Sequence, residues 1–250
     1  ERPLISQRPF RAPHHTISDV ALIGGGQWPR PGEVSLAHHG VLFLDEALEF
    51  RRNVLEALRE PLEVGKITVA RASTTITYPA SFILVLACNP CPCGYLGDTK
   101  KTCTCSYQQI ARYRAKLSGP LLDRIDLQVE IPRLDFSEIA SEKKEETSQE
   151  VRERVKKARE IQAERFREER IRLNGQMSAR YLRRFSPVQG EAKKLLEASM
   201  ESLALSARAY HRILKVARTI ADLEQSETIQ LEHVAEAIHY RSLDRKYQEP

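Results

Sequence analysis

Two short apolar runs stand out from an otherwise mixed sequence. Residues 41–44 read VLFL and residues 82–88 read FILVLAC. Continuous apolar runs of this length are typical of buried strands in a parallel sheet. The second run ends on Asn89-Pro90, because proline does not continue a central strand. We therefore predict two neighbouring strands.

The residues between these strands predict a helix and a β-hairpin. Phe50, Val54 and Leu58 recur at every fourth position, which predicts a helix that stops before Pro61. The runs KITVA and TTITY then alternate in polarity and are joined around Arg71-Ala72-Ser73, which predicts the hairpin. The order strand, helix, hairpin, strand indicates an open α/β sheet, whose ligands gather at the carboxyl ends of the strands.

The first 40 residues are rich in proline, glycine and histidine, and they predict irregular structure with short helical pieces. The GGG at residues 24–26 lacks the following Lys-Ser/Thr of a phosphate-binding loop. We expect it to form a flexible loop tip.

Strand patterns disappear after about residue 135. A long helix of mixed charge is predicted towards Arg172, followed by three shorter helices. The three begin at Ser186-Pro187, Ser206 and Thr228-Ile229-Gln230, and Ser186 with Gln189 matches a capping box. One apolar face that we assign to the core is formed by Tyr210, Ile213, Leu214, Ala217, Ile220 and Ala221.

The expected organisation is thus an α/β part over residues 1–134, a long charged helical connector over 135–185 and a helical domain over 186–250. With 41% apolar and 6% aromatic residues the composition is that of a soluble protein leaning towards helix. The net charge of +5 is compatible with a polyanionic partner. No stretch predicts a membrane span or a signal peptide, so we expect a cytoplasmic protein.

Polar residues that suit nucleotide hydrolysis follow both predicted strands. Asp45 and Glu46 come directly after the first strand, where one carboxylate can hold Mg²⁺ and the other can orient or deprotonate water. The alternative is that both acids cap the following helix. Asn89 ends the second strand, where its amide can hydrogen-bond a γ-phosphate or the attacking water. Arg124, in LSGPLLDRIDL, offers a planar cation suited to phosphoryl charge.

The order of these features resembles that of AAA+ ATPases of the magnesium-chelatase-like branch. More closely, RPFRAPHHT, GGGQWPRPGEVSLAHHGVLFLDE and NPCPCG are similar to segments of the YifB/ComM family, and the resemblance covers nearly the whole chain. It implies a P-loop NTPase sheet with a hairpin before the sensor-1 strand, followed by a helical lid. Members normally carry the phosphate-binding loop shortly before RPFRAPHHT. We therefore expect this chain to be a fragment that begins after that loop and binds ATP poorly by itself.

The resemblance also assigns roles to individual residues. Asp45 and Glu46 would be the Walker B pair, with Asp45 on Mg²⁺, and Asn89 the sensor-1 residue. Arg124 would be the arginine finger, completing the ATP site of a neighbouring subunit in a ring, expected to be a hexamer. Arg208, in the S-x-R of the helical part, would be the second sensor arginine.

A DNA contact is implied for the hairpin. In related hexameric DNA motors a hairpin at this place projects into the central channel with a basic residue near its tip. The resemblance makes Arg71 the first candidate and Lys66 the second; the alternative is an exposed turn arginine without a partner. Arg112, Arg114 and Lys116 are weaker candidates that could equally face a neighbouring subunit.

Four of the five cysteines are grouped in NPCPCGYLGDTKKTCTCS. Cys91, Cys93, Cys103 and Cys105 form two close pairs that could hold one tetrahedral Zn²⁺ through four thiolates. Free thiols, or disulfides formed during purification, are the alternatives. Cys88 is expected to be a small core residue.

Two histidine pairs complete the candidates. His14-His15 and His38-His39 are expected to serve packing and hydrogen bonding, since adjacent side chains rarely share one ion.

The function that the resemblance implies is an ATP-driven DNA motor, of the branch-migration or helicase type, in recombination or natural transformation. The alternatives are a chelatase-like remodelling ATPase that drives metal insertion into a tetrapyrrole, and a non-catalytic interaction module.

Overall fold

A computed structural model of the chain describes residues 7–26, 28–71, 74–133, 146–203 and 205–241. These residues fall into two compact units that divide after Ile125. We call the first the α/β unit and the second the helical unit, and describe each by itself. Among the described residues no helix is both long and apolar enough to cross a membrane.

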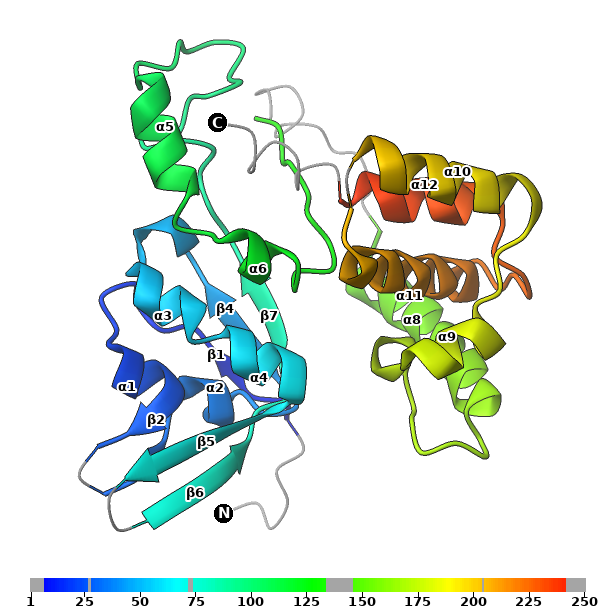
Figure 1. Cartoon of the computed structure of the whole chain (residues 1–250), viewed down its shortest axis with the longest axis horizontal. Coiled ribbons are helices and arrows are strands. Elements are labelled where there is room, and N and C mark those ends of the chain that lie inside the picture. The colour runs from blue at the N-terminus through cyan, green and yellow to red at the C-terminus, as the bar shows by residue number, and fades with distance from the viewer. Residues whose placement is uncertain (1–6, 27, 72–73, 134–145, 204, 242–250) are drawn as a thin grey trace. The chain divides into compact units, whose positions relative to one another are not determined.

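Among the described residues, three short parallel strands form the main sheet of the α/β unit (Figure 1). The central strand β4 (Val41–Leu44) pairs on one side with β1 (Phe10–Arg11) and on the other with β7 (Ile83–Leu86). Leu42 lies opposite Leu84 in the register of β4 and β7. The apolar runs that predicted two neighbouring strands are thus paired directly, which confirms a mixed α/β architecture.

The described residues of the α/β unit cover only one face of this sheet. Leu42 and Leu44 are fully buried in the core of the unit, beneath short helices. On the opposite face Phe10 is 64% exposed and Ile83 61% exposed. The prediction that the two strands are buried therefore holds for one face of the sheet only. An exposed apolar face of this kind normally contacts another element. The strands therefore have the continuous apolar sequence of buried strands, although the described residues cover only one of their faces.

The segment before β4 contains α1 (Asp19–Ile23), a two-stranded ribbon of β2 (Gly24–Gly25) and β3 (Arg30–Pro31), and α2 (Glu33–Leu36). The expected irregular structure with short helical pieces is confirmed. The glycines serve close backbone approach: a Cβ on Gly32 would lie 2.3 Å from the backbone nitrogen of Gly24.

The polypeptide after β4 is more broken than predicted. It forms the 3₁₀ helix η1 (Ala47–Glu49), then α3 (Arg52–Glu56) and α4 (Arg59–Val64). The prediction that the helix stops before Pro61 is wrong, because Pro61 lies in the first turn of α4. A proline is tolerated there, since the amide it lacks would have no intrahelical partner.

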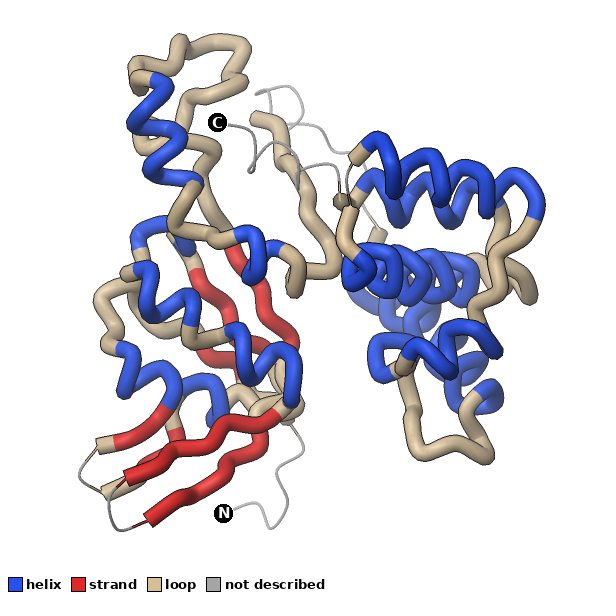
Figure 2. Tube along the Cα trace, viewed as in Figure 1, coloured by secondary structure: helices blue, strands red, loops and turns tan. Residues whose placement is uncertain are grey.

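The predicted hairpin is present as β5 (Lys66–Arg71) and β6 (Thr74–Pro79), a ribbon separate from the three-stranded sheet (Figure 2). Ile67 and Val69 are buried and Thr68 between them is exposed, as the alternation predicts. Arg71 pairs with Thr74 as the last residue of β5, and Ala72 and Ser73 lie outside the described residues.

The remaining helices of the α/β unit follow β7. They are α5 (Tyr107–Arg114), which begins with a capping box at Ser106, and α6 (Gly119–Leu122), capped by Ser118.

The helical unit contains five α-helices and one 3₁₀ helix among the residues described. They are α8 (Ser148–Arg165), η2 (Asn174–Gln176), α9 (Ala179–Phe185), α10 (Gly190–Ser202), α11 (Ala207–Leu223) and α12 (Leu231–His239). The long charged helix ends at Arg165, earlier than the sequence suggested. The predicted face of α11 is buried except at Tyr210, which is 37% exposed.

The start of α10 differs from the prediction. Ser186 does not cap it: Ser186 is buried, its hydroxyl donates to Met177 Sδ, and α10 begins after Gln189. Ser206 and Gln230 do precede α11 and α12, as predicted.

A buried carboxylate holds the helical unit together. Asp222 has no exposed surface and accepts hydrogen bonds from Arg165 Nη1 at 2.7 Å, from Asn174 Nδ2 at 2.7 Å and from Arg218 Nε at 3.1 Å. These donors come from α8, η2 and α11 itself. The network therefore ties α11 to the elements that precede it.

Asp222→Ala is expected to destabilise the helical unit by about 3–5 kcal/mol, because it leaves buried cations unpaired. Urea unfolding followed by helical circular dichroism would measure this. Glu191→Ala is the control, since its ion pair with Lys194 is exposed and should contribute at most about 1 kcal/mol. Equal midpoints for the two variants would contradict the role of the network.

Candidate functional site

The carboxyl ends of β4 and β7 bring three predicted residues to one edge of the sheet. Leu44 pairs with Leu86, and the pairing continues past the strands: Ala87 N–H donates to Leu44 O at 3.0 Å and Ala47 N–H donates to Ala87 O at 2.8 Å. Asp45 and Glu46 leave β4 inside this pairing. Asn89 lies two residues after Ala87, in the segment that follows β7. The side chains of Asp45, Glu46 and Asn89 are all exposed. The edge can thus present two carboxylates and an amide to one ligand.

Glu46 has an unusual backbone. Its φ of 49° and ψ of 45° place it in the left-handed region, which costs a non-glycine residue about 1–2 kcal/mol. The surrounding turn supports it: Asp45 Oδ1 accepts from Glu46 N–H at 2.9 Å, and Glu46 O accepts from Glu49 N–H at 2.7 Å. Such strain concentrates at functional sites, where it aims a side chain.

Two contacts of this turn could not be seen from sequence patterns. His15 Nδ1 lies 3.2 Å from Glu46 Oε2, so the loop after β1 reaches the carboxylate. Lys116 Nζ donates to Leu48 O at 2.5 Å and lies 3.8 Å from Glu49 Oε2, so the segment after α5 fastens η1. Neither contact has a local signal, because the partners are far apart in sequence.

Tyr113 of α5 belongs to the same surroundings. Burial, together with the charge of Glu49, raises the pKa of Tyr113 to about 12. The phenol therefore stays protonated beside the acidic turn at neutral pH.

The weaker basic candidates are divided by the structure. Arg114 Nε donates to Pro90 O at 3.2 Å and Lys116 to Leu48 O, so both make contacts within the α/β unit. Arg112 is exposed on α5.

Arg124 follows α6 and is held within its own chain. Its Nε lies 3.1 Å from Glu63 Oε2 of α4, its Nη1 donates to Pro120 O at 2.6 Å, and only 9% of the side chain is exposed. The Nε–Glu63 contact is an ion pair and not a hydrogen bond, since Arg124 Nε has no hydrogen-bond acceptor among the described residues. Arg208, in contrast, is exposed in the first turn of α11 in the helical unit.

The hairpin places Lys66 on its exposed side. Thr68 and Thr77 lie opposite each other on the same ribbon, with their hydroxyls 3.0 Å apart. Tyr78 anchors β6 to the preceding segment by donating to Pro29 O at 2.9 Å.

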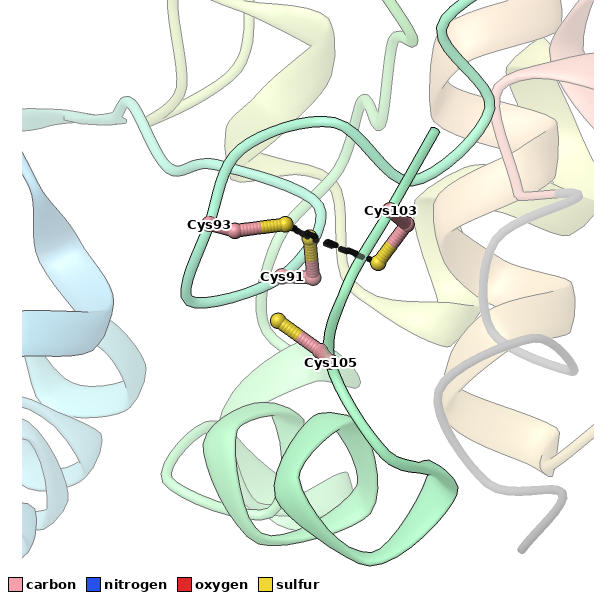
Figure 3. Close-up of side chains that lie close together, drawn as sticks. All are labelled: Cys91, Cys93, Cys103 and Cys105. Carbon is pink, nitrogen blue, oxygen red and sulfur yellow. Dashed lines mark hydrogen bonds between the residues drawn. The ribbon is translucent and has the colours of Figure 1, made fainter. Parts of the chain in front are cut away.

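The four clustered cysteines meet in space. Figure 3 shows the sulfurs of Cys91, Cys93, Cys103 and Cys105 turned towards a common centre, and all four lie within 4.8 Å of one another. Three of the separations are 3.4, 3.7 and 3.6 Å. These are too long for disulfides, and all five cysteines are free. Zn–S bonds of about 2.3 Å in a tetrahedron place sulfurs about 3.8 Å apart, so the cluster has the size of a four-thiolate metal site.

The thiols differ in acidity before any metal binds. Backbone N–H groups of Tyr95 and Thr104 lower the pKa of Cys93 to about 6. Desolvation raises the pKa of Cys105 to about 12. Cys88, in contrast, is exposed, so the expectation that it is a core residue is wrong: β7 ends two residues earlier and the chain turns outward.

The histidine pairs make hydrogen bonds and ring contacts, as expected. Ser81 N–H donates to His38 Nδ1 at 3.0 Å, and His14 Nδ1 lies 3.0 Å from the Thr16 hydroxyl. Among the described residues, the cysteine cluster is the one group with metal-binding geometry.

Comparisons with known proteins point to the same family in both parts of the chain. The family described as magnesium chelatase, subunit ChlI, matches residues 1–139, and the family of the ChlI C-terminal part matches residues 145–241. The competence protein ComM of Haemophilus influenzae is 50% identical over 97% of this chain, and the uncharacterized protein YifB of Escherichia coli is 48% identical over 96% of it. The chain spans about half the length of these relatives, 47% and 46% respectively.

Proposed function

Because the chain belongs to the magnesium chelatase ChlI family, in the group of ComM and YifB, we propose that it is part of a ring-forming AAA+ ATPase that acts as a motor on DNA. The observation that carries this proposal is the shared edge of β4 and β7, where Asp45, Glu46 and Asn89 leave adjacent parallel strands. The name of the Haemophilus relative associates that protein with competence, which favours recombination or transformation as the setting.

The edge fits a magnesium nucleotide. Asp45 is an exposed carboxylate whose Oδ1 accepts from Glu46 N–H, and carboxylate oxygens suit Mg²⁺. Bound there, the ion would neutralise charge on the phosphates. Glu46, set apart by its left-handed backbone, would accept a proton from the attacking water. Asn89 would donate its amide hydrogens to the γ-phosphate or orient that water.

The two arginines would complete the site by movement or assembly. We propose that Arg124 acts on the nucleotide of a neighbouring subunit, which requires its contact with Glu63 to open. The exposed Arg208 would contact the nucleotide from a helical lid. The role of Arg124 needs a ring, which we propose to be a hexamer. Light scattering would distinguish it from a monomeric interaction module.

The hairpin supplies the proposed DNA contact. Lys66 and the threonines beside it are exposed on one side of the ribbon, and Arg71 ends β5 next to the turn. Several copies around a ring would add phosphate contacts, which makes binding strongly dependent on salt.

Steady-state ATP turnover tests the proposal, in a form of the protein as long as its relatives, with and without branched DNA. We expect DNA to stimulate turnover several-fold, and Arg71→Ala to reduce the stimulation without changing turnover in the absence of DNA. Lys194→Ala, which removes one positive charge from an exposed position on α10, is the matched control. Turnover that is indifferent to DNA would contradict the motor and favour the remodelling ATPase of the chelatase type.

We also propose that the cysteine cluster holds a structural Zn²⁺. The support is the approach of four sulfurs to one centre and the two backbone N–H groups that stabilise the Cys93 thiolate, a common arrangement around metal-bound sulfur. The ion would connect the residues that follow Asn89 to the start of α5 and so fix a loop that has little secondary structure of its own.

A further inference from the structure

The segment of residues 90–116, which contains the cysteine cluster and α5, carries most of the net charge of the chain. It has five basic residues and one acidic residue, a formal charge of +4, whereas the whole chain carries +5. The five are Lys100, Lys101, Arg112, Arg114 and Lys116. The rest of the protein is therefore close to neutral.

These charges are used in two ways. Arg114 and Lys116 donate to backbone carbonyls of the α/β unit, as described above, and serve its folding. We call residues 91–105, which follow β7 and contain the four clustered cysteines, the cysteine loop (Figure 1). Lys100 and Lys101 are exposed in this loop. Of the five basic residues in this segment, Lys100 and Lys101 are the two that are consecutive and lie in a loop.

The loop tip has a defined geometry. Asp98 Oδ1 accepts from Lys100 N–H at 2.7 Å and from Lys101 N–H at 2.9 Å, so the one acidic residue of the segment fixes the lysine backbone. Lys101 Nζ lies 3.3 Å from the hydroxyl of Tyr95 and 4.9 Å from the centre of its ring. Tyr95 itself is 36% exposed. The tip thus places the ammonium group of Lys101 against an exposed aromatic ring, with the exposed Lys100 next to it in the chain.

The base of the loop is closed by the cysteines, since Cys91 and Cys93 on one arm face Cys103 and Cys105 on the other. A closed loop loses little conformational freedom when its tip binds a ligand. Two adjacent exposed lysines, one of them against an exposed ring, suit a strand that offers phosphates and unstacked bases, because cations follow the backbone and aromatic rings stack on bases.

We propose that the loop tip, formed by Tyr95, Lys100 and Lys101, binds single-stranded nucleic acid. The lysines contact phosphates and Tyr95 stacks on an unpaired base. In the proposed DNA motor this surface is a second contact, separate from the hairpin. The proposal depends on the proposed DNA motor only in one respect, namely that the bound strand is DNA and not RNA.

Charge reversal at the tip tests the proposal, with fluorescein-labelled oligothymidine as the probe and anisotropy measured over a salt series. Lys100→Glu with Lys101→Glu should weaken binding at least tenfold and lower the salt slope of log K by about 1.4, for two lost single-strand phosphate contacts. Tyr95→Ala should weaken binding about tenfold with little change in slope. Lys193→Glu with Lys194→Glu, an exposed lysine pair on α10, makes the same change in net charge and should bind like the unmodified chain.

Equal losses in the two double variants would overturn the proposal, because binding would then follow total charge. Unchanged binding by the tip variants would also overturn it. So would tighter binding of duplex than of single strands, if Tyr95→Ala did not alter that preference. Thiol titration with and without Zn²⁺ checks that the loop remains closed in each variant.

Binding is measured without ATP, so its outcome is independent of the proposed motor. A chain that binds through the tip, in a protein whose ATP turnover ignores DNA, would refute the motor and keep the tip. A DNA-stimulated ATPase whose tip variants bind normally would do the reverse.

Discussion

Glu46→Gln is expected to lower ATP turnover by about 10²–10⁴-fold in a form of the protein as long as its relatives, if Glu46 is the general base as proposed. Glutamine keeps the size of the side chain but cannot take a proton from water. Because Asp45 is the proposed Mg²⁺ ligand, nucleotide affinity should change little. Turnover and nucleotide binding are measured separately. We expect kcat to fall and the nucleotide affinity to stay nearly the same.

The neighbouring acid provides the control for this result. Glu49 is exposed on η1, one turn beyond Glu46, and Glu49→Gln should leave turnover near that of the unmodified protein. Comparable losses in both variants would point to a general effect of acidic charge and contradict the assignment. Glu46→Gly offers a second check: it relieves the left-handed strain and should stabilise the fold by about 1 kcal/mol while removing activity.

Cys103→Ser with Cys105→Ser is the second variant with a large expected effect. The purified chain should contain about one zinc ion and the double variant almost none, since two of four ligands are lost. Structural zinc sites have apparent binding free energies of about 10–16 kcal/mol, so several kcal/mol of local stability should disappear with the ion. Zinc is measured by elemental analysis and stability by thermal unfolding of the chain with and without a chelator.

Cys88→Ser is the matched control, because Cys88 is exposed and lies outside the cluster. It should retain zinc and melt like the unmodified chain. If the unmodified chain binds no zinc after reconstitution under reducing conditions, or if the double variant melts unchanged, the four thiols are not a structural metal site.

Periodicity and motifs determined much of the fold. The apolar runs located β4 and β7, the alternating pattern located the β5–β6 hairpin, and the stripe of α11 is its buried face except at Tyr210. These features depend on which residues are three, four or two positions apart, and backbone geometry fixes that relation locally. The breaks around Pro61 and Ser186 were missed because a cap or a first turn is recognised only once the helix start is known.

The candidate site is determined by the sequence only in part. The family motifs nominated Asp45, Glu46, Asn89 and the cysteines, and the tertiary structure decided how they are held. His15 reaches Glu46, Lys116 reaches Leu48 from 68 residues away, and four sulfurs from two arms of one loop meet. Such contacts leave no periodic trace, because they depend on where packing brings distant segments. The sequence therefore specified which groups are available, and the fold determined which of them act together.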